Sequence, residues 1–143
     1  MPQPAILQQL LDLIEPTLPM FLADAGLTTF PGPESIRAAL GSLVADQRDL
    51  VERAGTLLDE QGGAAPRRGY PIRYTALHDV DLASLLPGLV TGIDQQAAAL
   101  DTLLGSTAPG PEADLVRDAL QSARFHGDAL RALAAPRPAA TLP

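Results

Sequence analysis

The stretch that decides the fold runs from Glu34 to Gly63 and reads ESIRAALGSLVADQRDLVERAGTLLDEQGG. Its apolar residues recur every three or four positions, the spacing that places them on one face of an α-helix. This seam consists of Ile36, Leu40, Leu43, Leu50, Ala54 and Leu57, widened by Val44, Val51 and Leu58. The Gly62-Gly63 pair ends the pattern, because glycine adopts left-handed backbone geometry at low cost. The sequence therefore predicts a helix over residues 34–61.

A second segment with helical period covers residues 4–25 and contains two internal prolines. Proline lacks the backbone N–H of a helical residue, and its ring crowds the preceding turn. We therefore expect a kink or a short break at Pro16 and Pro19, and a C-terminal stop at Gly26. The sequence alone leaves open whether this first helix folds against the others.

Two more helices are predicted in the second half of the chain. The third covers residues 81–104, with Asp81 or Ser84 as its N-terminal cap. The fourth covers residues 111–134 and begins with a proline, followed by acidic residues that favour the positive end of a helix. Aromatic residues make up only 3% of the chain, so Leu, Ala and Val must fill the core.

The connection over residues 62–80 is rich in proline and glycine, so it predicts a long non-helical loop that crosses the helices. We expect three of its side chains to lie against them: Tyr70, Ile72 and Tyr74. Together these segments predict an all-α fold, an antiparallel four-helix bundle over residues 1–135 with a crossover loop between its second and third helices. Residues 136–143 are expected to form a frayed tail.

Composition and charge limit the classes of function. The formal net charge is −7 and the basic residues are scattered, which disfavours nucleic acid and anionic membranes as partners. The absence of cysteine excludes thiolate chemistry and Cys-ligated metals. The sequence contains no Ser–His–acid series, no Gly-rich phosphate loop and no lysine, so no catalytic motif is recognised. Without a signal region or a long apolar run, a cytoplasmic location is expected.

Polar residues interrupt the apolar seams near the middle of the helices. The interrupting residues are Gln47, Gln96, Ser122 and His126, with Glu15 and Thr17 at a comparable depth of the first helix. Because antiparallel neighbours bring the middles of helices to similar heights, we expect one polar layer across the core. Its simplest role is hydrogen bonding between helices, which fixes their register. Ligand binding and metal ligation stay open as alternatives.

The stretch Leu43–Gly63, followed by a proline-rich connection and Asp81–Pro87, resembles the ferritin-like superfamily, in particular small relatives of rubrerythrins and bacterioferritins. The resemblance covers helices two to four and the crossover loop. It implies a four-helix bundle with a dinuclear metal site, held by a Glu from each of two helices and a Glu-x-x-His motif from each of the other two.

Carried onto this chain, the metal motif of that family is degenerate. The second helix places Gln47 and Leu50 at the motif positions, the third helix Gln96, and the fourth helix Ala123 and His126. Two hard cations need several anionic oxygens, so we expect no di-iron or di-manganese centre. A metal-dependent oxidoreductase or iron-handling protein is the minority alternative. It would need another set of ligands turned inward: Glu15, Asp46, Asp94 and His126.

Three hypotheses for function follow. The favoured one is a bundle without a cofactor or enzymatic activity, acting through self-association as a dimer or through a protein partner of unknown identity. The second is the metal-dependent protein. The third is a small-ligand binder, in which the polar layer supplies the few polar groups of an apolar pocket. A cavity at the level of Gln47, Gln96 and His126 would favour the third hypothesis over the first.

Overall fold

The computed structural model describes residues 2–64, 69–77 and 80–134. Within these ranges the chain consists of α-helices and short 3₁₀ helices joined by turns, without a β-strand. The α-helices are α1 (Pro4–Ile14), α2 (Leu18–Ala25), α3 (Glu34–Glu60), α4 (Leu82–Gly105) and α5 (Pro111–Ala134). The 3₁₀ helices are η1 (Leu27–Thr29) and η2 (Ile72–Ala76). The all-α fold predicted from the sequence is therefore confirmed.

Helix α3 forms where the sequence predicted the longest helix, and one face of it lies in the core. Most of the predicted seam is buried: Ile36, Leu40, Leu43, Val44, Leu50, Ala54 and Leu58. Glu34 stands in the first turn, where its negative charge favours the positive end of the helix. The helix ends just before Gly62, whose φ of 77° is a left-handed conformation that glycine adopts without steric cost.

Two prolines divide the first predicted helix into α1 and α2, so the expected break is present. Thr17, between them, has an extended backbone with φ −98° and ψ 159°. Pro19 follows in the first turn of α2, where the missing N–H is tolerated. The buried side chains of α1 are Leu7, Leu10, Leu11 and Ile14. Since α1 contacts α3 and α4, the first helix is part of the same core as the others.

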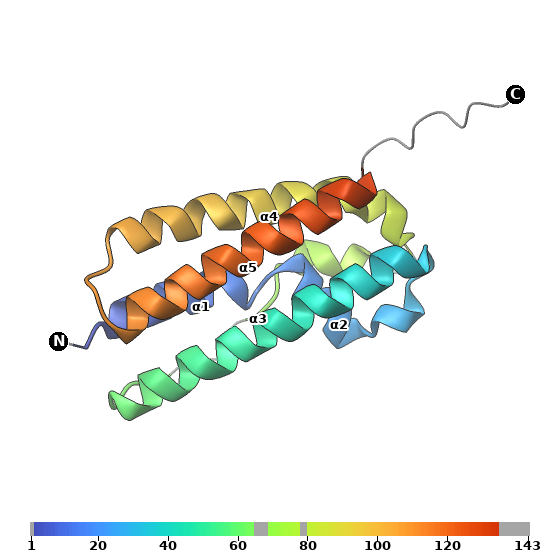
Figure 1. Ribbon diagram of the computed structural model, residues 1–143. Helices are drawn as coiled ribbons and strands as arrows, with labels where there is room; N and C mark the ends of the chain where they lie inside the picture. The colour runs from blue at the N-terminus through green and yellow to red at the C-terminus, as the bar shows by residue number, and fades with distance from the viewer. Residues whose placement is uncertain (1, 65–68, 78–79, 135–143) are drawn as a thin grey trace, which may run out of the picture.

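Helices α4 and α5 share the most extensive helix–helix contact of the described chain. Figure 1 shows them side by side, joined by a short connection at one end. In the polar side-chain pairs that link α5 to its neighbours, residue numbers rise along one helix as they fall along the other. The pairs are Arg53–Asp118 and Asp46–His126 between α3 and α5, and Asp94–Arg131 and Asp101–Arg124 between α4 and α5. Solvent screens most of these charges, so they mark helix register more than they stabilise the fold.

The start of α4 is fixed by a side-chain cap and by a backbone contact. The carboxylate of Asp81 accepts a hydrogen bond from the N–H of Ala83 at 2.7 Å, so Asp81 is the N-cap and not Ser84. The carbonyl of Pro31 accepts a second hydrogen bond from the N–H of Leu82 at 2.7 Å. This contact ties the start of α4 to the turn that precedes α3.

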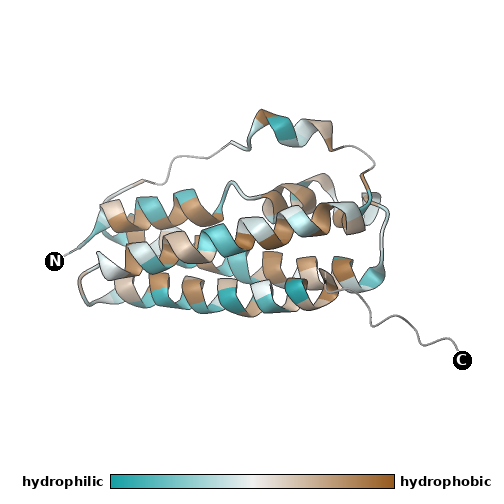
Figure 2. Cartoon of the chain, turned by 90° about the horizontal axis from the view of Figure 1, so that it is seen from above, coloured by the Kyte–Doolittle hydropathy of each residue, from teal (hydrophilic) through white to brown (hydrophobic). Residues whose placement is uncertain are grey.

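Aliphatic side chains fill the core, as the low aromatic content predicted. The core cluster is dominated by leucine, and Phe30 is an aromatic residue within it. Figure 2 shows hydrophobic and hydrophilic residues alternating along the helices, which is the pattern of helices with one buried face. Among the helices of the described ranges, none is both long and apolar enough to span a membrane.

The crossover segment departs from the prediction in two respects. It contains the short helix η2, although residues 62–80 were expected to be non-helical throughout. Ile72 is 86% exposed, although it was expected to lie against the helices. In a 3₁₀ helix residues two positions apart point in different directions, so Tyr74 can face the helices while Ile72 faces solvent. The predicted tail at residues 136–143 lies outside the described residues.

Candidate functional site

A line of hydrogen bonds joins the first three predicted helices. The hydroxyl of Thr17 donates to Oε1 of Gln47 at 3.2 Å, and Nε2 of Gln47 donates to Oε1 of Gln96 at 3.2 Å. Gln47 is buried, while Thr17 and Gln96 are half-buried. The buried amide therefore has partners for both its donor and its acceptor, which offsets the cost of removing it from water. These residues form the polar line of the molecule.

Among the described residues, His126 and Ser122 make no hydrogen bond to the polar line, and the buried imidazole of His126 pairs with Asp46 instead. The Nε2–H of His126 donates to the carboxylate of Asp46 at 2.5 Å. Ser122 is half-buried on α5. The cause is the helical turn of about 100° per residue, which points the neighbouring side chains of Asp46 and Gln47 towards different helices. Asp46 faces α5, whereas Gln47 faces the break between α1 and α2.

We expect His126→Ala to lower the free energy of unfolding by about 2 kcal/mol, because a buried ring is replaced by a cavity. Asp46→Asn should cost less than about 1 kcal/mol, because Asp46 is exposed and the amide oxygen can still accept the hydrogen bond. Urea unfolding of the wild type and both variants measures the difference. Equal losses in the two variants would show that the hydrogen bond to Asp46, and not the burial of the imidazole, is what stabilises this contact.

The residues of the metal hypothesis do not meet at one point. Asp94 forms an ion pair with Arg131 at 2.5 Å and Asp46 contacts His126, each on the flank of α5. Glu15 lies at the break between α1 and α2. Within the described ranges, no three His, Asp or Glu side chains are close enough together to hold a metal ion.

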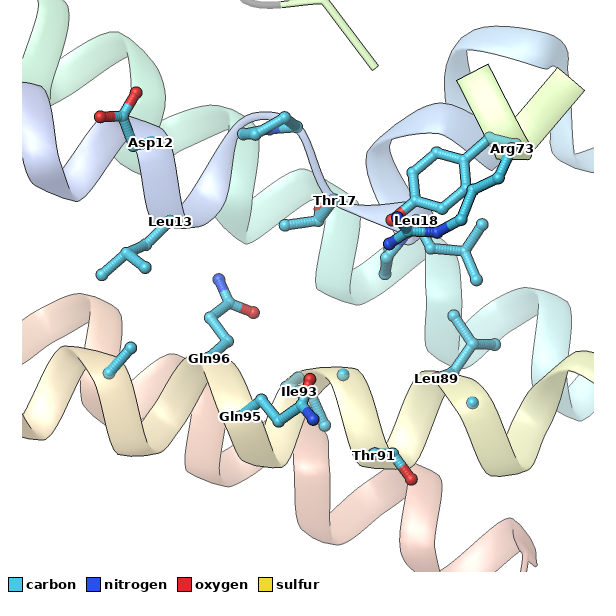
Figure 3. Close-up of a pocket in the computed structure, with 16 residues that line it drawn as sticks. Asp12, Leu13, Thr17, Leu18, Arg73, Leu89, Thr91, Ile93, Gln95 and Gln96 are labelled. Atoms are coloured by element: carbon cyan, nitrogen blue, oxygen red, sulfur yellow. The ribbon is translucent and has the colours of Figure 1, made fainter. Parts of the chain in front are cut away.

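A groove of about 690 Å³ lies between the break in the first helix and α4. Leu13 and Leu18 point into it from one wall, and Leu89 and Gln96 point into it from the other (Figure 3). Its lining is mainly apolar, with neutral polar groups at Thr17, Gln95 and Gln96. The groove therefore opens directly onto the outer end of the polar line, where Gln96 presents the Nε2 of its amide.

Two glycines keep the α4 wall of the groove open. Gly88 and Gly92 both line it, and a Cβ atom built at either position meets no other atom within 4 Å. Neither glycine is thus required for close packing. Glycine inside a helix lowers stability by about 0.5–1 kcal/mol relative to alanine. No close packing contact requires either glycine, so packing gives no reason for this loss of stability. Their effect is to leave room in front of Gln96.

Aromatic contacts fix the far end of the groove. The ring of Phe21 on α2 lies 5.4 Å from the rings of both Tyr70 and Tyr74, measured between centroids. The hydroxyl of Tyr70 also donates to Asp24. Burial and this hydrogen bond raise the pKa of Tyr70 well above its ordinary range, so the hydroxyl stays protonated and keeps donating. These contacts hold η2, and with it Arg73, at the end of the groove.

Glu112 is a buried carboxylate, whereas its sequence context predicts only an acidic residue at a helix start. It accepts hydrogen bonds from the backbone N–H of Gln3 at 2.9 Å and from Nε2 of Gln61 at 3.0 Å. Burial alone would raise the pKa of Glu112, but these hydrogen bonds outweigh it and the pKa is lowered. A signal was present in the sequence, because Glu112 stands three residues before Leu115 and so continues the buried stripe of α5.

We compared the chain with protein-family models, with curated proteins and with solved structures, and nothing matched. The groove, the polar line and the Asp46–His126 contact are therefore the observations on which a function is inferred. The kinship with the ferritin-like superfamily stays a hypothesis based on the sequence pattern.

Proposed function

We propose that the protein is a non-enzymatic binding protein that holds a small amphiphilic molecule in the groove between α4 and the break in the first helix. The observation that carries this proposal is the groove itself, with a volume of about 690 Å³ at the level of Gln96. Ligand pockets in proteins commonly have volumes of about 300–1,000 Å³, apolar walls and a few well-placed polar groups. The groove fits each of these criteria.

The polar line supplies a fixed hydrogen-bonding group for such a ligand. Oε1 of Gln96 is already engaged by Gln47, so the amide of Gln96 is oriented with its Nε2 towards the groove. Within the described part of the chain, this NH₂ group has no hydrogen-bond acceptor. A donor held in place by a buried partner loses little conformational entropy when it binds, which favours affinity and selectivity.

The architecture proposed with this function is an antiparallel four-helix bundle in which α1 and α2 together count as the first helix. The register of the cross-helix pairs and the burial of α1 support that arrangement. A distant ferritin-like origin, with Gln47 and Gln96 where metal ligands would stand, is compatible with it. Metal redox chemistry is not part of the proposal, because Asp46 and Asp94 already contact His126 and Arg131.

The test uses phenylnaphthylamine, a neutral apolar dye whose fluorescence increases in apolar surroundings. We expect the wild-type protein to bind the dye and Gly92→Phe to weaken binding by about tenfold or more, because the new ring occupies the groove. Gly88→Leu provides a second blocked variant if Gly92→Phe does not fold. Circular dichroism establishes that each variant keeps its helices.

Gly41→Phe is the matched control, because Gly41 is also an open glycine within a helix but lies on α3 away from the groove. This variant should bind the dye as the wild type does. The proposal fails if the wild-type protein does not bind the dye, or if the Gly41 and Gly92 variants lose binding equally.

Self-association is the second candidate function, and one observation favours it. Phe125 is 68% exposed on α5, with its ring edge-on to His126 at a centroid distance of 5.1 Å. Aromatic residues are enriched at protein interfaces, and a second copy of the chain would remove this ring from water. We propose that a dimer could form through this part of α5. Sedimentation of the wild type and a Phe125→Ser variant tests this: a wild-type dimer that the substitution dissociates would support it.

A further inference from the structure

Within the described ranges, every arginine except Arg73 forms an ion pair with Asp or Glu. The paired arginines are Arg37, Arg48, Arg53, Arg117, Arg124 and Arg131. Arg73 lies instead over the ring of Tyr74, with its guanidinium carbon 5.2 Å from the ring centroid. In a chain with a net charge of −7, an exposed cation that no carboxylate of the described chain neutralises is a notable exception.

The position of Arg73 relates this charge to the groove. Arg73 lines one end of the groove, and Asp12 lies at the opposite end of the view in Figure 3. Leu18 and Leu89 lie near Arg73, and Gln96 lies farther along. The groove therefore presents, in order, a cation, an apolar stretch and an amide donor. A molecule with an anionic head, an apolar body and a neutral hydrogen-bond acceptor near its far end matches that order.

The negative charge of the rest of the molecule limits the ligand to a single anionic group. Arg73 is the cation of the groove lining, and Asp12 contributes a carboxylate to the same lining. A polyanion would meet more repulsion than attraction here, because the protein's net charge of −7 repels each additional negative charge on the ligand. A carboxylate also suits the planar guanidinium, which can donate two parallel hydrogen bonds to its two oxygens.

We propose that the ligand of this groove is a free medium-chain monocarboxylate that carries a neutral hydrogen-bond acceptor near its far end. Its carboxylate binds Arg73, its apolar chain runs past Leu18 and Leu89, and its acceptor meets Nε2 of Gln96. This inference rests on the proposed function of the groove and adds the chemical class of the ligand. Tyr74 positions Arg73 through the contact with its ring, and Phe21 fixes Tyr74 in turn. The cation is thus held in place before the ligand arrives.

The test is displacement of bound phenylnaphthylamine by two competitors with the same chain, decanoate and decanol. In the wild type we expect decanoate to displace the dye at about tenfold lower concentration than decanol, because a carboxylate on an arginine adds charge-assisted hydrogen bonds. The preference should narrow as salt is raised, since Arg73 is exposed and its charge is screened. Arg73→Gln should abolish the preference.

Two variants serve as controls. Arg124→Gln removes an exposed arginine outside the groove and should keep the preference for decanoate. Arg73→Lys retains the positive charge without the planar guanidinium, so this variant should keep part of the preference for decanoate.

The outcomes separate this inference from the proposed function. If the dye binds and Gly92→Phe blocks it, but decanoate and decanol compete equally, the groove is a binding site and the ligand class is wrong. If Arg73→Gln weakens both competitors to the same extent, Arg73 only supports the structure and the inference again fails. If the wild type binds no dye and neither competitor by calorimetry, both the function and the ligand class are wrong.

Discussion

Leu10→Ala is expected to lower the free energy of unfolding by about 3 kcal/mol, a large part of the 5–15 kcal/mol typical of a domain. Leu10 is fully buried on α1, so truncation removes apolar contacts and leaves a cavity within the core. The result matters because the sequence alone left the position of the first helix open. Urea unfolding of the purified variant, followed by circular dichroism, measures the loss.

Leu13→Ala is the matched control on the same helix. Leu13 is half-buried and faces the groove, so its truncation should cost less than about 1.5 kcal/mol. If Leu10→Ala cost no more than Leu13→Ala, α1 would not be packed into the core in solution. The groove would then lose one of its walls, and the proposed function would fall with it.

Glu112→Ala is expected to lower the free energy of unfolding by about 3 kcal/mol. The substitution leaves the N–H of Gln3 and the amide of Gln61 without their acceptor in a buried setting. Oε1 of Gln61 already lacks a donor within the described chain, so loss of the carboxylate would leave both polar atoms of this side-chain amide without a partner there. Asp114→Ala, an exposed acid in the same turn of α5, should cost less than about 1 kcal/mol and is the control. Equal losses would contradict a structural role for the buried carboxylate.

Glu112 also predicts a dependence of stability on pH. Its pKa in the folded protein lies below the ordinary value of 4.5, so the unfolded chain binds a proton more readily than the folded protein does. The stabilisation is therefore fully present above pH 4.5 and is lost as the pH falls below it, towards the pKa of the folded state. The difference between the wild type and Glu112→Gln, measured by urea unfolding across this window, should shrink on acidification. A difference independent of pH would exclude this linkage.

The sequence predicted the helices well because each depends on local signals. Periodic leucines, proline and glycine at the ends, and a capping aspartate act within a few residues of one another, so they can be interpreted without a tertiary structure. The break at Pro16, the cap at Asp81 and the end of α3 before Gly62 are of this kind. Gln47 was also correctly identified as an interior polar residue, because it interrupts an apolar seam.

The candidate site could be predicted only in part, because its residues come together through helix rotation and loop placement. Gln96 was identified from the sequence, but its role at the groove depends on the missing side chains of Gly88 and Gly92. His126 was identified as an interior polar residue and is buried, but its hydrogen bond to Asp46 could not be predicted from the sequence. Arg73 was not singled out for binding, since nothing in its sequence neighbourhood shows that it has no carboxylate partner among the described residues.

The sequence by itself determined the all-α class, the places where helices begin and end, and the residue types that interrupt their apolar faces. These features follow from backbone geometry and from the helical period, which act over short distances along the chain. The tertiary structure alone decided that Asp46 and Gln47 serve different neighbours, that Glu112 is buried while Asp114 is exposed, and that Arg73 lies at the end of a groove. The physical reason is that each of these outcomes depends on which surfaces of distant segments meet, and a rotation of one helix by a single residue would change all of its contacts.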